Sequence, residues 1–354
     1  MPLILVLFIH FGMSSYYETV FVLFFVNVVL AASLNLTNGI TGIFSLGQAG
    51  FMGLGAYIGS LLTLDEANKL SRIDGIPEWL AATQLPFPIA MLIAGILAAV
   101  IAGLIGFVIL RSRGHYLAVI TLGMIIVIKN LLDNATIFTN GPKGISGMAL
   151  NTTMFSSVVI ALITLFVLYR FRVSAYGRSM IALREDEDAA KSLGISASQI
   201  RLMSFVTSAF FGAVGGCMWA HLERTLAPSM FYFDETFVIL EMSVLGGMAT
   251  ISGALPGAAI LTFVPQLLAS FDTGFYIGSF HVPQISGLTS MVMSILFILV
   301  IVFRSGGVTG NSEYIVESLF SKETYLGLLK RRTYTDFVNN IKQIKFPKRK
   351  RTEE

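Results

Sequence analysis

Residues 177–200 read GRSMIALREDEDAAKSLGISASQI, and five consecutive charged residues stand at their centre: Arg184, Glu185, Asp186, Glu187 and Asp188. Successive helical residues lie about 100° apart, so these charges cover every face of a helix and keep this turn out of a bilayer. Gly194 is placed to end a short helix as a left-handed cap, and Ser196-x-x-Gln199 has the capping-box pattern that begins another. A merely solvated loop would explain the charges but not the caps. The stretch therefore predicts a short helix, a tight turn and then an apolar helix.

The rest of the chain is strongly apolar. Of its 354 residues, 55% are hydrophobic and only 13% are charged, whereas soluble domains carry about 25% charged residues. A large soluble core would need a charged surface that this chain lacks. The composition therefore predicts an all-α polytopic integral membrane protein, with roughly eight to ten transmembrane helices and a short cytoplasmic coupling helix. The single cysteine, Cys217, excludes an internal disulfide.

A membrane-spanning helix needs about 20 mostly apolar residues. Ten segments meet or approach this length: 1–13, 20–36, 43–64, 86–110, 116–132, 153–170, 202–222, 237–252, 255–270 and 286–303. The segments 237–252 and 255–270 are short and are separated by GALPG, so they form either two tilted spans or one broken element. The N-terminal segment is also short, but it lacks the basic leader and cleavage site of a signal peptide.

The basic residues predict the orientation, because cytoplasmic loops carry an excess of Lys and Arg. With residues 177–200 in the cytoplasm, five basic residues fall outside: Lys69, Arg72, Lys129, Lys143 and Arg224. The others fall inside, among them Arg111, Arg113, Arg170, Arg172, Arg178, Arg184, Lys191, Arg201 and Arg304. We therefore predict a transmembrane domain over 1–303 and a basic cytoplasmic tail over 304–354. The tail is expected to be solvated or attracted to anionic lipid.

Motifs for catalysis or metal binding are missing from the sequence. There is no G-x-x-x-x-G-K-[ST] phosphate loop, no G-x-S-x-G elbow and no H-E-x-x-H helix. The four histidines, His10, His115, His221 and His281, have no metal-ligand spacing. The chain is therefore not expected to be an enzyme or to bind a metal or cofactor.

Two ionisable residues lie within predicted spans, Lys129 and Glu241. An ion-coupled transporter usually keeps several such residues in its spans, because they carry the coupled ions. Glu241 either reaches water from a helix end or belongs to a substrate path. Two residues give thin support for ion coupling, but this alternative class stays open.

Small residues at close-packing spacing recur in the spans, at Gly55 and Gly59, Gly212 and Gly216, and Gly253 and Gly257. This spacing favours tight helix packing over direct contact with a substrate. Residues 37–59 add an irregular, polar and glycine-rich segment, which is tolerated at membrane depth only where protein or a water-filled cavity covers it. Interrupted helices commonly build substrate pathways. We therefore predict a substrate path among Ser45, Gln48, Thr121, Glu241, Gly246 and Gly247.

Five stretches in the same order resemble the LivM-type permeases of branched-chain amino acid ABC importers. They are LNLTNGITGIFSLGQAGFMGLGAYIGSLL (34–62), GHYLAVITLGM with TNGPKGI (114–124, 139–145), ALREDEDAAKSLGIS (182–196), VLGGMATISGALPGA (244–258) and VFRSGGVTG (302–310). The third resembles the cytoplasmic E-A-A-x-x-x-G loop of such permeases, with Asp188 in place of the usual glutamate. The resemblance covers about residues 20–310.

The resemblance implies a permease subunit in a bacterial inner membrane that acts with a second permease, two cytoplasmic ATPases and an extracytoplasmic binding protein. ATP and magnesium would bind the ATPases, and nucleic acid is not an expected partner. Branched-chain or related amino acids would be the substrate, with urea, short amides or sugars as alternatives. The 177–195 helix would dock on an ATPase through Arg184, Glu185, Glu187 and Asp188, while Ala189, Ala190 and Gly194 keep the surface low.

The sequence also departs from the family pattern. Lys129 occupies the basic position of an E-I-x-R element, but Ile126 stands where its acid would be. Glu241 is not a usual residue of the family at its site. One hypothesis is that Glu241 replaces the missing acid as the partner of Lys129.

Overall fold

The computed structural model describes residues 15–73, 75–110, 115–273, 275–277, 280–282, 287–304, 306–310 and 313. The chain divides into two units, Met1–Glu313 and Tyr314–Glu354, and the second lies outside the described residues. The predicted span 1–13, the basic residues Arg111 and Arg113 and most of the predicted tail also lie outside them. The predicted division at residue 303 stays a prediction, although Glu313 still belongs to the first unit.

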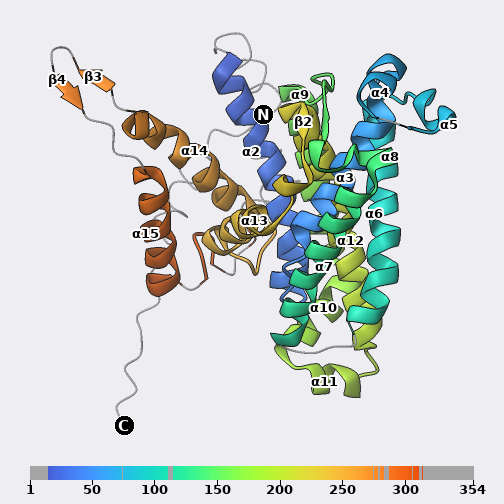
Figure 1. Ribbon diagram of the computed structural model, residues 1–354. Coiled ribbons are helices and arrows are strands. Elements are labelled where there is room, and N and C mark those ends of the chain that lie inside the picture. Colours follow the sequence, from blue (N-terminus) through green and yellow to red (C-terminus); the bar gives the residue numbers. More distant parts are fainter. Residues whose placement is uncertain are drawn as a thin grey trace, which may run out of the picture. The chain divides into compact units, whose positions relative to one another are not determined.

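Long helices follow one another along the first unit (Figure 1). They are α2 (Ser15–Leu34), α3 (Gln48–Thr63), α6 (Phe87–Ile109), α7 (His115–Asn134), α9 (Met154–Val173), α12 (Ala197–Glu223), α13 (Phe233–Gly246), α14 (Ala254–Thr273) and α15 (Leu288–Phe303). The six-residue π-helix η1 (Asn35–Ile40) continues α2 directly.

Shorter elements connect these helices. The short helices are α4 (Glu66–Arg72), α5 (Glu78–Ala81), α8 (Thr136–Thr139), α10 (Ala175–Glu185) and α11 (Glu187–Ser192), with 3₁₀ turns η2 (Gly141–Lys143) and η3 (Pro228–Met230). Two small antiparallel ladders pair β1 (Ile145–Ser146) with β2 (Thr225–Leu226), and β3 (Phe275–Ile277) with β4 (Phe280–Val282). Figure 1 shows α10 and α11 at one end of the long helices and α4 and α5 at the other.

The all-α membrane fold is confirmed. Among the described residues, five helical segments are long and apolar enough to cross a membrane: Ser15–Ile40, Phe87–Ile109, Tyr116–Asn134, Met154–Val173 and Ala197–Glu223. Two shorter apolar helices, Ala254–Ala269 and Leu288–Phe303, accompany them. The predicted total of eight to ten spans stays a prediction.

Helix α12 lies at the centre of the core, where it packs against α3, α6 and α2. Glycines allow the closest of these contacts. A Cβ atom on Gly55 would lie 2.1 Å from the carbonyl oxygen of Ala213, and one on Gly216 would lie 1.9 Å from that of Met52. The predicted tight packing at the glycine pairs is therefore confirmed for α3 and α12.

The predicted irregular segment is confirmed, and it shortens the span expected over 43–64. Helix α3 begins only at Gln48, after a stretch from Gly42 in which Gly42 has a φ of +73°. The Asn38 side chain pairs with both backbone groups of Ser45, donating to its carbonyl and accepting from its N–H at 3.0 Å each. The non-helical backbone is tolerated because this buried side chain satisfies it.

The predicted interruption between the last spans lies earlier than expected. The sequence places it at GALPG, but Ala254, Leu255, Pro256 and Gly257 already form the first turn of α14. Proline fits there because the first-turn N–H groups have no helical partner. The actual break, residues 247–253, begins at Gly247, whose φ of +118° suits glycine.

Candidate functional site

The charged stretch forms two helices, so the prediction of one helix over 177–195 is wrong. Helix α10 ends at Glu185, and α11 begins at Glu187. Between them Asp186 is extended, with φ −154° and ψ 110°, and its carboxylate accepts from the N–H groups of Asp188 and Ala189 at 2.9 and 3.0 Å. An aspartate in this position caps a new helix more favourably than it continues an old one. The five charges therefore do not wind around a single helix.

The C-terminal end of α11 has the predicted glycine cap. Gly194 has a φ of +82°, its N–H donates to Lys191 O at 2.9 Å, and the N–H of Ile195 donates to Ala190 O at 3.1 Å. This pair of bonds is the Schellman motif. The predicted capping box at Ser196 is wrong in its bonding, because Ser196 precedes α12 without a side-chain cap hydrogen bond.

Glu187 fastens α11 to α12. Its carboxylate lies 2.8 Å from Lys191 Nζ and 2.6 Å from Arg201 Nη2. The hydrogen bond from Lys191, helped by the one from Arg201, lowers the pKa of Glu187 to about 2. Capped at both ends and anchored by this ion pair, α11 is held in one position. We call residues 174–194, which comprise α10 and α11 and their caps, the coupling segment.

We expect the anchoring by Glu187 to depend on pH. Because folding lowers the pKa of Glu187 from 4.5 to about 2, the ion pair contributes stability above the unfolded pKa and loses it as the pH falls through the folded one. Glu187→Gln should lower the thermal midpoint at pH 7, at a cost of about 1 kcal/mol. The difference from wild type should be constant from pH 7 to about 5 and smaller at pH 3.

The matched control is Asp188→Asn, because the Asp188 side chain is 95% exposed. This variant should keep the thermal midpoint at pH 7 close to that of wild type. Equal midpoints of wild type and Glu187→Gln at pH 7 would contradict the anchoring role.

The other residues predicted to contact an ATPase occupy different environments. Asp188 and the side chain of Glu185 are largely exposed, as are Ala189 and Gly194. Ala190 is 2% exposed, so it packs inside the protein and does not keep an outer surface low. Arg184 bonds Glu185 and also reaches the Gly39 carbonyl at 2.9 Å. The sequence prediction missed Leu193, which is 81% exposed beside the Gly194 cap.

Three of the residues predicted for the substrate path lie close together where α3 begins. Ser45, Gln48 and Thr121 are all buried. The Thr121 hydroxyl accepts from the N–H of Leu46 at 3.0 Å, and the Ser45 hydroxyl accepts from the N–H of Gly47 at 3.3 Å. These side chains support the turn into α3 in this conformation. Their part in a substrate path stays a prediction.

Gln48 joins three helices. Its side-chain nitrogen donates to the Ser33 hydroxyl on α2 at 2.6 Å, and its oxygen accepts from the Ser208 hydroxyl on α12 at 3.2 Å. The Ser208 hydroxyl also lies 2.7 Å from the carbonyl oxygen of Ser33. A polar side chain satisfied in this way holds buried helices in register.

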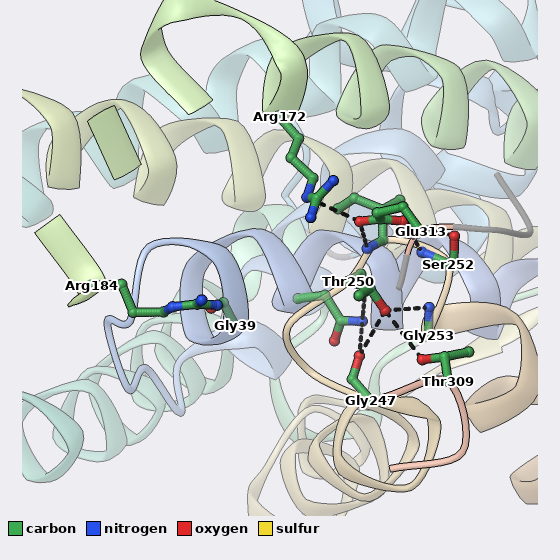
Figure 2. A network of polar contacts seen from close by, with 11 residues as sticks. Gly39, Arg172, Arg184, Gly247, Thr250, Ser252, Gly253, Thr309 and Glu313 are labelled. Atoms are coloured by element: carbon green, nitrogen blue, oxygen red, sulfur yellow. Dashed lines mark hydrogen bonds and ion pairs between the residues drawn. The ribbon is translucent and has the colours of Figure 1, made fainter. Parts of the chain in front are cut away.

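Gly246 and Gly247 accept hydrogen bonds in a second polar cluster, at the break between α13 and α14. Figure 2 shows Gly247 in this cluster. A Cβ atom on Gly246 would lie 1.8 Å from the carbonyl oxygen of Gly253, so Gly246 permits close approach of the two helices. The sequence prediction missed Asn35, which is fully buried and donates to the carbonyl of Thr250 at 2.7 Å. Its side-chain oxygen accepts from the Ser243 hydroxyl. The two clusters therefore meet at the junction of α2 and η1, where Ser33 binds one and Asn35 binds the other.

The hypothesis that Glu241 is the ionic partner of Lys129 is wrong. Lys129 Nζ lies 2.7 Å from Asp133 Oδ2, one helical turn further along α7, and 5.9 Å from the centre of the Tyr232 ring. The i, i+4 spacing of Lys129 and Asp133 is the signal in the sequence that could have identified this pair. Glu241 lies partly buried on α13, and its predicted place in a substrate path stays a prediction.

Within the described residues, no group of three or more His, Cys, Asp or Glu side chains is placed to hold a metal ion. The cluster around Gln48 consists of hydroxyl, carboxamide and backbone groups. The cluster at the break also contains the Glu313 carboxylate and the Arg172 guanidinium.

Comparisons with known proteins identify a family and several relatives. Residues 16–302 match the family described as "Branched-chain amino acid transport system / permease component". The chain is 32% identical over 279 residues to the high-affinity branched-chain amino acid transport system permease protein LivM of Escherichia coli strain K12, covering 69% of this chain and 62% of LivM. The chain thus spans about 62% of the length of that relative.

Two other relatives are more distant. The permease protein LivH of the same organism is 27% identical over 154 residues, which cover 44% of this chain and 45% of LivH. The ribose import permease protein RbsC of Haemophilus influenzae is 22% identical over 243 residues, covering 63% of this chain and 71% of RbsC. No solved structure matches the chain significantly.

Proposed function

Because this chain belongs to the family of branched-chain amino acid transport system permease components, we propose that it is the transmembrane permease subunit of an ATP-driven importer. It would move branched-chain or related amino acids, delivered by an extracytoplasmic binding protein, across a bacterial inner membrane. The protein is a multi-pass membrane permease, and its coupling segment and C-terminus would face the cytoplasm. The second permease would be a related subunit, as LivM and LivH occur among the relatives.

The observation that carries this proposal is the coupling segment. The segment carries most of the described charges at one end of the long helices. Its helix α11 is nevertheless capped at both ends and fastened by the ion pairs of Glu187. Two capped helices between two spans are suited to receive a displacement from another protein, because a transmitted movement requires a body that does not deform. ATP would be bound and hydrolysed by that partner.

Uptake measurements test the proposal directly. In a strain lacking this chain and complemented with it, labelled leucine, isoleucine and valine should be taken up, and the uptake should require ATP. The same panel should contain urea, a short amide, ribose and galactose, because sugar import permeases are among the relatives. Selective uptake of a sugar would replace the substrate class. Uptake driven by an ion gradient without ATP would overturn the importer class.

We expect exposed residues of the coupling segment to be required for uptake, because they would contact the ATPase. Leu193→Asp should lower uptake at least about tenfold, because it places a charge at the most exposed apolar side chain of the segment. Gly194→Val should act similarly through the backbone, since valine disfavours the φ of +82° although nothing lies within 4 Å of the added Cβ. Ala190→Arg would be uninformative because Ala190 is buried.

Leu193→Met is the matched control and should keep uptake close to wild type. The amount of subunit in the membrane must be measured for each variant, to separate coupling from folding. Wild-type uptake by both Leu193→Asp and Gly194→Val would exclude the segment as the docking surface.

A further inference from the structure

The break at 247–253 leaves helix-end backbone groups that need partners, and the segment after α15 provides them. At the C-terminal end of α13, the carbonyl of Leu245 accepts from the N–H of Val308 at 2.9 Å. The carbonyl of Gly246 accepts from both the N–H and the hydroxyl of Thr309, at 3.0 and 2.8 Å. These bonds cap α13 with a part of the chain that lies some 60 residues further on.

Glu313 bonds two backbone amides of the break itself, shortly before α14 begins (Figure 2). One carboxylate oxygen accepts from the N–H of Ile251 at 2.7 Å, and the other accepts from the N–H and the hydroxyl of Ser252 at 2.9 and 2.7 Å. The first oxygen also lies 3.1 Å from Nε of Arg172, and the Glu313 side chain is only 5% exposed. Glu313 therefore joins the break to the last turn of α9.

Arg184 approaches the same break from the other end of α10. Its guanidinium donates to the carbonyl of Gly39 in η1 at 2.9 Å. A Cβ atom on Gly39 would lie 1.6 Å from the carbonyl oxygen of Met248, so η1 and the break touch through their backbones. Asn35, at the other end of η1, bonds Thr250. Movement of Arg184 would thus reach the break through η1.

Both arginines are attached closely to the coupling segment. Arg172 stands three residues before Ala175, and the turn between them is tight: a Cβ atom on Gly177 would lie 2.0 Å from the carbonyl oxygen of Arg172. Arg184 lies in the last turn of α10. A displacement of the segment must therefore move both guanidinium groups.

We propose that Arg172 and Arg184 are positioning residues that connect the coupling segment to the break between α13 and α14. Arg172 acts through Glu313, and Arg184 acts through η1. When a partner displaces the segment, the ion pair of Arg172 with Glu313 and the hydrogen bond from Arg184 to Gly39 pull on both sides of the break and change the packing of α13 and α14. The expected effect on uptake rests on the proposed transport function, but the connection between the segment and the break can be tested without measuring transport.

Hydrogen exchange on the purified full-length chain tests the connection. Exchange of the Ile251 and Ser252 amides should accelerate about tenfold or more in Glu313→Gln, because this variant loses part of the carboxylate that bonds them. Arg172→Gln should have the same effect, although Arg172 contacts neither amide directly. Arg184→Gln should accelerate exchange at 247–253 by loosening η1. Arg170→Gln, an exposed arginine on the same turn of α9, should leave these rates unchanged. Unaltered exchange in Arg172→Gln and Arg184→Gln would overturn the connection.

A second experiment tests transmission in vesicles that contain the whole importer complex. Arg172→Gln, a change outside the residues expected to contact the ATPase, should lower the amount of solute moved per ATP hydrolysed about tenfold, while ATP hydrolysis itself continues. Arg172→Lys, which keeps the charge, should restore part of this ratio. A purely structural role would lower uptake and hydrolysis together, in proportion to the folded complex, and would refute transmission.

The two experiments fail in different ways. If the wild-type complex shows no ATP-dependent uptake, the proposed function is wrong, and hydrogen exchange still decides whether the arginines hold the break. If wild type transports and Arg172→Gln keeps its ratio of uptake to hydrolysis, the inference is wrong and the proposed function stands.

Discussion

Gly216→Ala is expected to remove most of the folded protein from the membrane, although it adds a single methyl group. The added Cβ would lie 1.9 Å from the carbonyl oxygen of Met52, and backbone atoms of α3 cannot move aside as a side-chain tip can. Helices α3 and α12 would have to separate along the contact at the centre of the core. We expect a loss of about 3 kcal/mol of stability, measured as a lower midpoint of thermal unfolding in detergent.

Gly123→Ala is the matched control, because it makes the same change inside another apolar helix, α7, with nothing within 4 Å of the new Cβ. It should keep or raise the midpoint, since alanine favours a helix over glycine by about 1 kcal/mol. Gly55→Ala should resemble Gly216→Ala, because its Cβ would lie 2.1 Å from the carbonyl oxygen of Ala213. A wild-type midpoint in Gly216→Ala would show that the two helices do not pack as closely as described.

Local signals predicted several features correctly. The apolar segments predicted the helices of the membrane fold. Gly194 predicted the end of α11, because a left-handed cap depends only on the residue and its neighbours. The glycine pairs predicted close packing of helices, but they did not show which helix packs against which. Asp186 was missed for a local reason: its side chain competes with the helix for the N–H groups of Asp188 and Ala189. A run of charged residues does not show which of them will cap a new helix.

Contacts between distant residues account for the other omissions. Glu313 bonds Ile251 across 62 residues, and neither residue carries a sequence pattern that selects the other. Asn35 was unremarkable in an apolar stretch, yet it is fully buried and bonds three groups at the break. Buried polar side chains become significant only when the fold shows what they must satisfy. The sequence therefore predicted a charged helical segment, but not the contacts by which Arg184, Glu187 and Glu313 join distant helices.

Asn35→Leu is expected to release the break from η1 and to cost about 3 kcal/mol of stability. Leucine has the same branched skeleton of heavy atoms as asparagine, so the main change is the loss of hydrogen bonds. The Thr250 carbonyl loses a donor at 2.7 Å, and the Ser243 hydroxyl loses its acceptor on Asn35, both in a region without exposure to solvent. A buried carbonyl in a loop has no helical alternative, so its desolvation is not recovered. A lower thermal midpoint, with faster hydrogen exchange at 247–253, would be the measured result.

Asn27→Leu makes the same substitution two helical turns earlier on α2, where Asn27 donates to the hydroxyl of Thr262 at 2.9 Å. Thr262 lies within α14 and can turn its hydroxyl to a carbonyl of its own helix, so we expect a cost of about 1 kcal/mol. The difference in stability loss between the two variants measures how much more a polar contact contributes at a broken helix than between two intact helices. If Asn27→Leu destabilised the protein as much as Asn35→Leu, any buried asparagine would serve equally well. Unchanged hydrogen exchange at 247–253 in Asn35→Leu would show that the break does not depend on this side chain for its support.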